Sequence, residues 1–435
     1  TIEAVSALFA EKGSNAWFEM DAADILPKGF ACPHCGKSAG FTKEEDTLDG
    51  WFDSGSTHFA AMKKDQGFWP ATMYLEGLDQ YRGWFQSSLL TAVGAFGEGA
   101  PFKECVTHGW TVDGEGRAMH KSLGNGVDPA DIFNENGADI LRLWAASADY
   151  HADVRCSKAI FQQLSQNYLK FRNTCKFMLD NLVDFDPAHL TKAEDMPVLD
   201  RWLITKLNEL IEKVEQSYND YEFHIITHAV NDFCVTTLSS FYLDIVKDRL
   251  YCEAADSAER RSAQTALYLT LSTLAKLFAP ILAFTCDEIW LAMPHTAEDD
   301  ARNVVLNDMN KPFTAYALDA ETMARWEHII EVRTAVNGAL EEARAAKVIG
   351  KSLEADVHLT VPEGDVFLAD ENPAALADLF IVSKVELTVG GELAVKVENA
   401  AGTKCPRCWK HSLTPNAEGL CPRCAEVVRH LPDLL

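Results

Sequence analysis

The spacing of apolar and polar residues divides the chain into a first α/β region and a second region of long amphipathic helices. Apolar runs at 72–75 and 104–107 contain β-branched or aromatic residues and end in glycine-bearing turns, so both are expected to be strands. The stretch 84–96 between them is expected to be a crossover helix. Strand, helix and strand in this order predict a parallel pair, with ligands gathering at the carboxyl ends of the strands.

Helical periodicity dominates from residue 128 onward. Asp128 followed by Pro129 is typical of a helix start, and 138–148 has the spacing of a second helix. Apolar residues three and four positions apart predict further core-facing helices, which cover 199–214, 223–250, 263–293 and 326–346. Residues 357–361 and 385–389 are expected to be strands of a small α+β unit.

The longest apolar stretch, 277–286, has ten residues and ends at two acids, so we expect a buried helix there and no membrane span. No signal peptide is recognisable, and the chain starts without Met, which suggests a partial chain. Six of the 12 cysteines form three Cys-x-x-Cys pairs and the others are scattered among apolar neighbours. This usage predicts a reducing cytoplasmic location and metal-binding thiols.

The charge is strongly acidic, with 39 Lys+Arg against 65 Asp+Glu and a formal net charge of −26. Taken alone, it argues against a nucleic-acid partner, because phosphate binding requires local positive potential. Two regions depart from the average. Residues 401–435 carry a net charge of +2 (five basic and three acidic residues), and 155–176 has no acid and five basic residues, namely Arg155, Lys158, Lys170, Arg172 and Lys176. The charge therefore excludes only a broadly basic nucleic-acid binder.

Two of the thiol pairs lie close together near the end of the sequence. Cys405-Pro-Arg-Cys408 and Cys421-Pro-Arg-Cys424 are separated by twelve residues. Each pair can supply two of the four ligands of a tetrahedral zinc ion, so we expect a structural zinc site without an open coordination position. The alternative is two surface pairs or disulfides.

The third pair, Cys32 and Cys35, has no second pair nearby in the sequence. Two sulfurs do not complete a zinc site. Half of a metal site and a lone surface turn are both compatible with this pattern.

The first candidate for ligand chemistry is the turn that follows the strand at 72–75. Glu76 and Gly77 are followed by Asp79 and Gln80 at the start of the predicted helix, which also contains Trp84. This order places a carboxylate and hydrogen-bonding groups at the edge of the sheet, where Gly77 lets a ligand approach the backbone. The alternative is structural, with Asp79 as a helix N-cap and Trp84 buried.

The second candidate is the glycine-rich segment 108–125, which follows the strand at 104–107. It presents Lys121, with Ser122 and Asn125 nearby, and is expected to be a flexible loop. Such a loop can close over a triphosphate while the lysine stabilises the charge that develops on the leaving pyrophosphate. The alternative is a hairpin-like turn with a solvated lysine.

These segments together resemble the class I aminoacyl-tRNA synthetases. Met-His-Lys-Ser at 119–122 is similar to their Lys-Met-Ser-Lys-Ser loop. Asp-Gly-Trp-Phe-Asp-Ser-Gly at 49–55, Glu-Gly-x-Asp-Gln-x-Arg-Gly-Trp-Phe at 76–85 and Cys-Pro-Arg-Cys-Trp at 405–409 resemble the bacterial isoleucine-specific family. The resemblance extends over essentially the whole chain and corresponds to the C-terminal half of that family.

The resemblance implies roles for individual residues. Glu76 and Gly77 contact the isoleucyl-adenylate, Asp79 with Gln80 anchors its amino group and ribose, and Trp84 forms a wall of the isoleucine pocket. Lys121 is the catalytic residue that stabilises the ATP phosphates. The remaining implied positions are His108 and Gly109 for substrate, Met119, His120 and Ser122 for the ATP loop, and Cys405, Cys408, Cys421 and Cys424 for zinc.

The sequence departs from the family pattern in the ATP loop and in length. Ala118 replaces the first lysine of the loop and His120 its first serine, so one phosphate-contacting cation is absent, while Lys121 keeps the essential charge. The upstream half of the family, with its His-x-Gly-His signature and most of the editing insertion, has no counterpart here. We therefore expect a functional loop in a chain that does not aminoacylate tRNA by itself.

The implied fold is an α/β Rossmann-type catalytic remnant, then an all-α anticodon-binding domain and a small α+β zinc-binding tail. The implied segments are the end of an editing or connective insertion (1–45), the second half of the catalytic domain (46–127), a helical stem-contact or connecting region (128–194), the anticodon-binding domain (195–345), an α+β junction (346–400) and the zinc-binding module (401–435).

The implied function is ATP-dependent activation of L-isoleucine and its transfer to tRNA(Ile). Structural zinc is the expected cofactor and Mg-ATP a substrate, and the protein is expected to be a cytoplasmic monomer without a membrane partner. The alternative function is a non-catalytic RNA-binding module made of the helical domain and the zinc tail.

Overall fold

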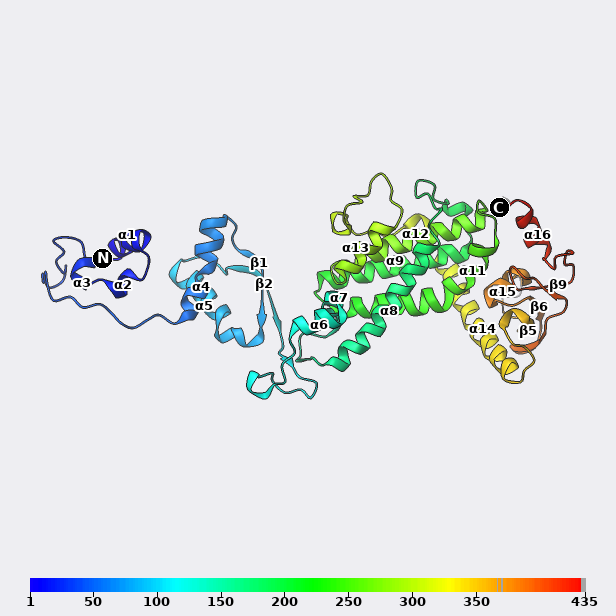
Figure 1. Cartoon of the computed structure of the whole chain (residues 1–435), viewed down its shortest axis with the longest axis horizontal. Coiled ribbons are helices and arrows are strands. Elements are labelled where there is room, and N and C mark those ends of the chain that lie inside the picture. The colour runs from blue at the N-terminus through cyan, green and yellow to red at the C-terminus, as the bar shows by residue number, and fades with distance from the viewer. Residues whose placement is uncertain (366, 369–370, 432–435) are drawn as a thin grey trace. The chain divides into compact units, whose positions relative to one another are not determined.

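The computed structural model describes residues 1–365, 367–368 and 371–431 (Figure 1). The chain forms two compact units, one from Thr1 to His108 and one from Gly109 onward.

The first unit begins with short helices and continues into a small α/β arrangement. Its helices are, in chain order, α1 (Ile2–Lys12), α2 (Ala16–Glu19), α3 (Ala22–Ile25), α4 (Gly50–Gly55) and α5 (Trp84–Leu90), with π-helical segments η1 (His58–Gln66) and η3 (Thr91–Ala95) and a 3-10 turn η2 (Leu78–Arg82). Strands β1 (Ala71–Gly77) and β2 (Phe102–His108) pair in parallel, with Gly77 opposite His108. The predicted strands, the helix between them and their parallel pairing are confirmed.

α4 packs closely against α5, and α5 contacts the middle of β1. Asp49 caps α4 by accepting a hydrogen bond from the backbone N–H of Trp51 at 2.8 Å. A Cβ atom at Gly55 would lie 2.6 Å from the Cβ of Ser87, so only glycine permits this approach of the two helices. Tyr74 of β1 is buried, and its hydroxyl lies 3.0 Å from the Ser88 hydroxyl of α5.

The second unit is mainly helical. Its α-helices are α6 (Pro129–Asn136), α7 (Ala138–Ser147), α8 (Lys158–Asp180), α9 (Val198–Asn219), α10 (Phe223–Asp232), α11 (Leu243–Cys252), α12 (Ala258–Phe278), α13 (Ala283–Ala292), α14 (Ala320–Ala345), α15 (Pro373–Phe380) and α16 (Pro422–Arg429), with a π-helical segment η6 (Phe233–Tyr242) between α10 and α11. Asp128 caps α6 by accepting from the N–H of Ala130, and Pro129 is its first residue. The predicted start at Asp128 is confirmed.

The strands of this unit are short. They are β3 (Thr111–Val112), β4 (Val154–Arg155), β5 (Ala355–Val361), β6 (Lys384–Val389), β7 (Ala394–Asn399), β8 (Thr403–Lys404) and β9 (His411–Ser412). β5 is the central strand of a three-stranded sheet, parallel to β6 and antiparallel to β7. The sequence predicted β5 and β6 but not β7.

The apolar stretch 277–286 is not one helix, and this expectation was wrong. α12 ends at Phe278 and α13 begins at Ala283, with Pro280 in the connection between them. Proline lacks the N–H that a continuing helix needs, and its ring clashes with the preceding turn. In the part of the chain that the structure describes, no helix is long and apolar enough to cross a membrane.

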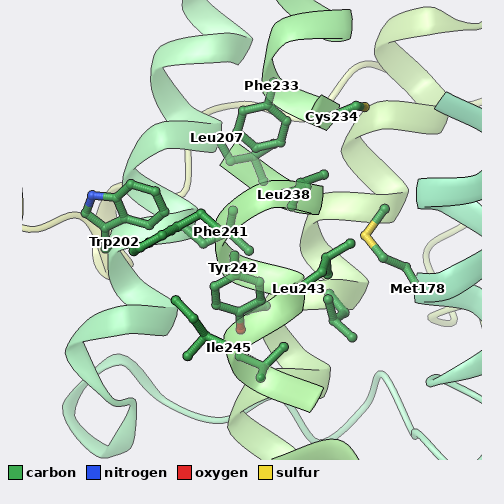
Figure 2. Close-up of a cluster of buried hydrophobic side chains, with 14 of the residues drawn as sticks. Met178, Trp202, Leu207, Phe233, Cys234, Leu238, Phe241, Tyr242, Leu243 and Ile245 are labelled. Carbon is green, nitrogen blue, oxygen red and sulfur yellow. The ribbon is translucent and has the colours of Figure 1, made fainter. Parts of the chain in front are cut away.

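A continuous apolar core runs through the second unit from α7 to the three-stranded sheet. Figure 2 shows the part of it around η6, where Phe233, Leu238 and Phe241 point toward side chains of α8 and α9. The rings of Trp202 and Phe241 meet edge to face, with centroids 4.8 Å apart. The predicted apolar face of α9 is therefore confirmed.

One carboxylate is fully buried in this core. Asp200 accepts hydrogen bonds from Arg249 at 2.8 and 3.0 Å, from the Tyr242 hydroxyl at 2.8 Å and from the Ser262 hydroxyl at 2.5 Å. Both carboxylate oxygens are satisfied, which is the condition under which a buried charge is tolerated. The network ties α9, α11 and α12 together.

Candidate functional site

The turn after β1 brings several predicted site residues together. Glu76 is exposed at the end of the strand, and Gly77 lies beside the Asp79 carboxylate. A Cβ atom at Gly77 would lie 2.6 Å from Asp79 Oδ1 and 3.8 Å from His108 Cε1. A side chain at this position would therefore displace the exposed Asp79 carboxylate from the place it holds beside the turn.

The side chain of Gln80, and not that of Asp79, binds the first N–H of α5, whose N-cap position is Gly83. The Gln80 side-chain oxygen accepts a hydrogen bond from the backbone N–H of Trp84 at 3.0 Å, and its amide nitrogen donates to Asp79 Oδ2 at 3.1 Å. The structural alternative that made Asp79 the N-cap is wrong, because the 3-10 turn η2 separates Asp79 from the start of α5. Asp79 stays exposed, with its carboxylate oriented by Gln80.

Trp84 is half-buried and held from two sides. Its indole N–H donates to the Ser54 carbonyl oxygen at 2.9 Å, and its ring stacks on Tyr74 with centroids 4.2 Å apart. Ser54 lies in α4, the helix that carries the motif at 49–55. The two motifs of the first unit therefore fix one aromatic side chain between them.

In the second unit, Asp113 organises the base of the lysine loop. Its carboxylate accepts hydrogen bonds from the backbone N–H groups of Glu115 and Arg117, from the Arg117 guanidinium and from the Asn125 amide, at distances between 2.9 and 3.0 Å. The Asn125 amide and the Arg117 backbone hold the pKa of Asp113 well below its usual range. Asp113 also donates its N–H to the Arg117 carbonyl, and Val112 bridges Ala118, so 112–118 is a hairpin.

Asn125 closes the loop around Lys121. Its side-chain oxygen accepts from the His120 N–H at 2.9 Å, while its amide donates to the Ala118 carbonyl at 3.1 Å. Lys121 and Ser122 lie on an exposed 3-10 turn, Lys121–Leu123. Met119 points the other way and packs against the small core of α6, α7 and α8. The hairpin alternative is thus observed at 112–118, but the lysine lies outside it, on a turn of its own.

Gly109 has a structural requirement that the sequence did not reveal. Its N–H donates to the Tyr150 carbonyl at 2.8 Å, and a Cβ atom there would lie 2.4 Å from the Ala152 carbonyl oxygen. The close approach of these two backbone segments accounts for glycine at this position.

The four tail thiols converge as predicted. The sulfurs of Cys405, Cys408, Cys421 and Cys424 all lie within 4.8 Å of one another, and those of Cys408 and Cys421 are 3.7 Å apart. All four cysteines are free, so the alternative of disulfides does not hold. A tetrahedral zinc ion with Zn–S bonds of about 2.3 Å places its sulfurs roughly 3.8 Å apart, so the quartet fits such an ion.

Backbone amides prepare one thiol for metal binding. Burial opposes the ionisation of Cys405, but N–H groups of Cys408, Cys421 and Arg407 donate toward its sulfur and lower its pKa overall. The Cys421 N–H lies 3.4 Å from that sulfur. Thiolates are the form that binds metal.

Cys32 and Cys35 form a turn but not a metal site of their own. The Gly36 N–H donates to the Cys32 carbonyl, and the Cys32 N–H donates to the Lys37 carbonyl, both at 2.8 Å. Over residues 1–365, 367–368 and 371–431, the tail quartet is the one group of three or more His, Cys, Asp or Glu side chains close enough to hold a metal ion.

The basic residues at 155–176 are all exposed, but two of them are paired with acids. Lys158 contacts Glu135 at 2.9 Å, and Lys176 contacts Asp180 at 2.8 Å. Both acids lie outside the acid-free window 155–176, Asp180 shortly after it and Glu135 well before it, so the basic surface is weaker than the sequence indicated.

The sequence reasoning missed the roles of Asp113, Arg407 and Arg423. Asp113 precedes Gly-Glu-Gly, which is a turn signal that could have identified it. The two arginines occupy the same place in the two Cys-Pro-Arg-Cys repeats, yet their partners lie more than 150 residues away in the chain.

Comparisons with known proteins agree with this organisation. Residues 1–157 match the family described as tRNA synthetases class I (I, L, M and V), and residues 200–359 match the anticodon-binding domain of tRNA ligase. Isoleucine–tRNA ligase of Moorella thermoacetica is 47% identical over 99% of this chain and 48% of its own length. That of Desulforamulus reducens is 48% identical over the same shares.

The chain spans about half the length of the curated relatives that it matches. Among solved structures, a ternary complex of Agrobacterium radiobacter LeuRS with tRNA and LeuAMS has a TM-score of 0.51 and 16% identity, covering 85% of this chain and 38% of the other. At that identity the likeness concerns the fold alone.

Proposed function

We propose that this chain, as a member of the class I aminoacyl-tRNA synthetases, forms part of an isoleucine–tRNA ligase. The observation that carries this proposal is 47% identity to such a ligase over 99% of the chain. A carboxylate oxygen of isoleucine bonds to the α-phosphorus of ATP and pyrophosphate leaves; a ribose hydroxyl of tRNA(Ile) then bonds to the acyl carbon and AMP leaves.

The first step requires positive charge where pyrophosphate separates. Lys121 is exposed on a turn whose base is fixed by Asn125 and Asp113, so its ammonium group can reach a phosphate without reordering the loop base. Such charge stabilisation acts on the transition state. The absence of the family's first lysine, at Ala118, leaves Lys121 as the cation of this motif.

The turn after β1 is proposed to hold the adenylate. The Asp79 carboxylate is oriented by Gln80 and exposed, which suits an amino group or a ribose hydroxyl. Trp84 is immobilised by Ser54 and Tyr74, which suits the wall of an apolar pocket. Glu76, Gly77, His108 and Gly109 complete the proposed substrate set.

The tail thiols are proposed to bind zinc. Four sulfur ligands leave no open coordination position, so zinc supplies a structural cross-link here and no chemistry on the substrate. The helices between residues 195 and 345 are proposed to contact the anticodon of tRNA(Ile). The proposed segments of the chain are 1–45, 46–127, 128–194, 195–345, 346–400 and 401–435.

ATP–pyrophosphate exchange tests the catalytic part. We expect no exchange with isoleucine by the chain alone, and exchange once a polypeptide with the His-x-Gly-His segment completes the enzyme. In the completed enzyme, Lys121→Ala should slow exchange about a hundredfold, because charge stabilisation of this kind contributes 10²–10³ in rate. Lys213→Ala, at an exposed position on α9, is the matched control.

Three results would contradict these assignments. Exchange by the chain alone would refute its predicted inactivity, an unchanged rate in Lys121→Ala would remove the role of that lysine, and equal exchange with valine would remove the isoleucine specificity.

The alternative is a non-catalytic RNA-binding module, and the self-contained core of the second unit supports it. Binding of tRNA(Ile) and of an unrelated tRNA separates the two functions. Preference for tRNA(Ile) favours the ligase, and equal binding favours the module.

A further inference from the structure

The two arginines of the tail repeats reach the same place, the C-terminal end of α11. Arg423 donates to both carboxylate oxygens of Asp248, at 2.6 and 2.8 Å, and to Glu253 at 2.7 Å. Arg407 donates to the backbone carbonyl of Tyr251 at 3.3 Å and to that of Cys252. Last-turn carbonyls of a helix lack intrahelical partners and carry negative partial charge, so a guanidinium is a favourable cap.

The geometry of both arginines depends on the thiol quartet. Arg407 lies within the pair Cys405–Cys408 and Arg423 within Cys421–Cys424, so the relative position of the two pairs sets the relative position of the two guanidinium groups. Arg407 also crosses between the pairs, with Nη1 3.7 Å from the sulfur of Cys424.

The tail has little else to hold its two pairs together. Its buried apolar cluster consists of Leu420, three of the four ligand cysteines and Cys252, which belongs to α11. A cluster of this size cannot stabilise a fold without a metal or another cross-link.

The tail also closes one side of a cavity of about 850 Å³. The cavity is lined by α11, α14 and α15 and by Arg407, Trp409 and Lys410 of the tail. Beneath Arg407, the thiol of Cys252 is 3.8 Å from the Arg407 carbonyl oxygen, and Cys252 is only 7% exposed.

We propose that Arg407 and Arg423 are positioning residues that make the tail a metal-dependent clasp on the end of α11. With metal bound, both guanidinium groups hold the end of α11, and the tail backbone at Arg407 stays over the Cys252 thiol. Without metal, the two pairs separate, the arginines leave α11, and the cavity loses the part of its wall that Arg407 supplies. This inference rests on the proposed metal site.

The other attachments of the tail do not depend on the metal in this way. Lys410 contacts Asp378 of α15, and the His411 N–H donates to the Ser383 hydroxyl at 2.8 Å. These contacts lie after the first pair, on the side of the three-stranded sheet. Release should therefore be confined to the end of α11.

Thiol labelling of the whole chain tests the clasp without an activity assay. A small alkylating reagent is added to the zinc-loaded and the chelator-treated protein, zinc content is measured, and labelling of each cysteine is followed by peptide mass spectrometry. We expect Cys252 to react about tenfold faster or more after chelation, because charge-assisted hydrogen bonds of this kind typically contribute at least that factor. The buried Cys175, Cys234 and Cys286 serve as internal references and should stay protected.

Two variants separate the clasp from the metal. Arg423→Gln and Asp248→Asn break the same contact from opposite sides, and both should speed labelling of Cys252 about tenfold while zinc stays at one per chain. Arg429→Gln is the matched control, because Arg429 is also in the tail but pairs with Glu426 of its own helix.

The outcomes are distinct. Failure to bind zinc refutes the proposed metal site. Zinc bound, with Cys252 labelled equally with and without it, overturns the clasp, and so does parallel labelling of the three reference cysteines, which would indicate loss of the whole fold.

Discussion

The turns at Cys32 and Cys405 have the same backbone structure in very different surroundings. In the first turn, the Gly36 N–H donates to the Cys32 carbonyl, and the Cys32 N–H donates to the Lys37 carbonyl. In the second turn, Trp409 and Lys410 take the places of Gly36 and Lys37 around Cys405. Both turns contain a residue with a left-handed backbone, Gly36 at φ 72° and Trp409 at φ 65°. Backbone N–H groups lower the pKa of Cys32 as well, those of His34 and Cys35 foremost.

The two turns differ in their burial and in the thiols and helices that surround them. Cys405 is fully buried, faces three more thiols and belongs to a tail whose arginines contact α11, whereas Cys35 is exposed. A Cys-x-x-Cys segment thus forms its turn locally, and the surroundings decide whether further thiols lie close enough to hold a metal ion with it. The comparison can be tested from either side.

Removal of one ligand from each turn should give the largest contrast. Cys408→Ser should abolish zinc binding by the tail, because structural zinc contributes about 10 kcal/mol or more to folding of such modules. Cys35→Ser should leave zinc content unchanged. Metal analysis of both purified variants checks this, and equal losses would mean that both turns carry metal.

Loss of the buried carboxylate should destabilise the second unit, which supports the tail turn, and leave the turn at Cys32 unaffected. Asp200→Ala leaves Arg249 of α11 without its partner, and breaking a buried pair typically costs about 3–5 kcal/mol. Urea unfolding of the second unit should show this loss, while Asp186→Ala, at an exposed carboxylate paired with His189, should show little. A comparable effect of both substitutions would contradict a special role of the buried network.

Adding a Cβ atom at Gly36 should destabilise the turn at Cys32, because Gly36 has a left-handed backbone. Gly36→Ala should destabilise that turn by about 1–2 kcal/mol, the cost of a left-handed backbone for a residue with Cβ. Hydrogen exchange at the Cys32 amide should accelerate accordingly, because this amide closes the turn.

The reciprocal change, Trp409→Gly, should be close to neutral. It relieves the backbone but removes the ring that Lys351 covers at 5.2 Å, a contact of about 0.5–1 kcal/mol at exposed sites. Strong destabilisation by Trp409→Gly would show that the ring, and not the turn, holds this region.

Low pH should slightly lower the free energy of unfolding of the second unit, because Asp184 becomes protonated. Arg260 holds Asp184 at a pKa of about 2 and also donates to the Leu250 carbonyl near the end of α11. A lowered pKa means that the stabilisation is present above about pH 4 and is lost as pH falls toward 2. Because Asp184 is 42% exposed, we expect less than about 1 kcal/mol, seen as a difference in urea midpoints between wild type and Asp184→Asn. No difference between them across this range would exclude the contribution.

The sequence predicted those features that depend on neighbouring residues. The strand–helix–strand order around Trp84, the cap at Asp128 and the four converging thiols all follow from short-range spacing. The hydrogen bond of Gln80 to α5 was missed because Asp79 is the commoner capping residue and the 3-10 turn η2, which contains both residues, leaves no signal in the pattern.

Long-range partners could not be predicted in the same way. Nothing near Arg423 indicates Asp248. The helix break within 277–286 is different, because Pro280 is a local signal for it that the apolar pattern alone overlooks. The acids that neutralise Lys158 and Lys176 lay outside the window that defined the basic surface.

The π-helical segment Phe233–Tyr242 sets the rotational phase between α10 and α11. Each residue added to or removed from a helix rotates everything beyond it by about 100°, since a turn contains 3.6 residues. Deleting a single residue there would therefore turn Arg249 away from Asp200 and Asp248 away from Arg423 at once. Chain length within this one segment, independent of residue identity, is a determinant of how the tail attaches, and insertions or deletions there should be far less tolerated than substitutions.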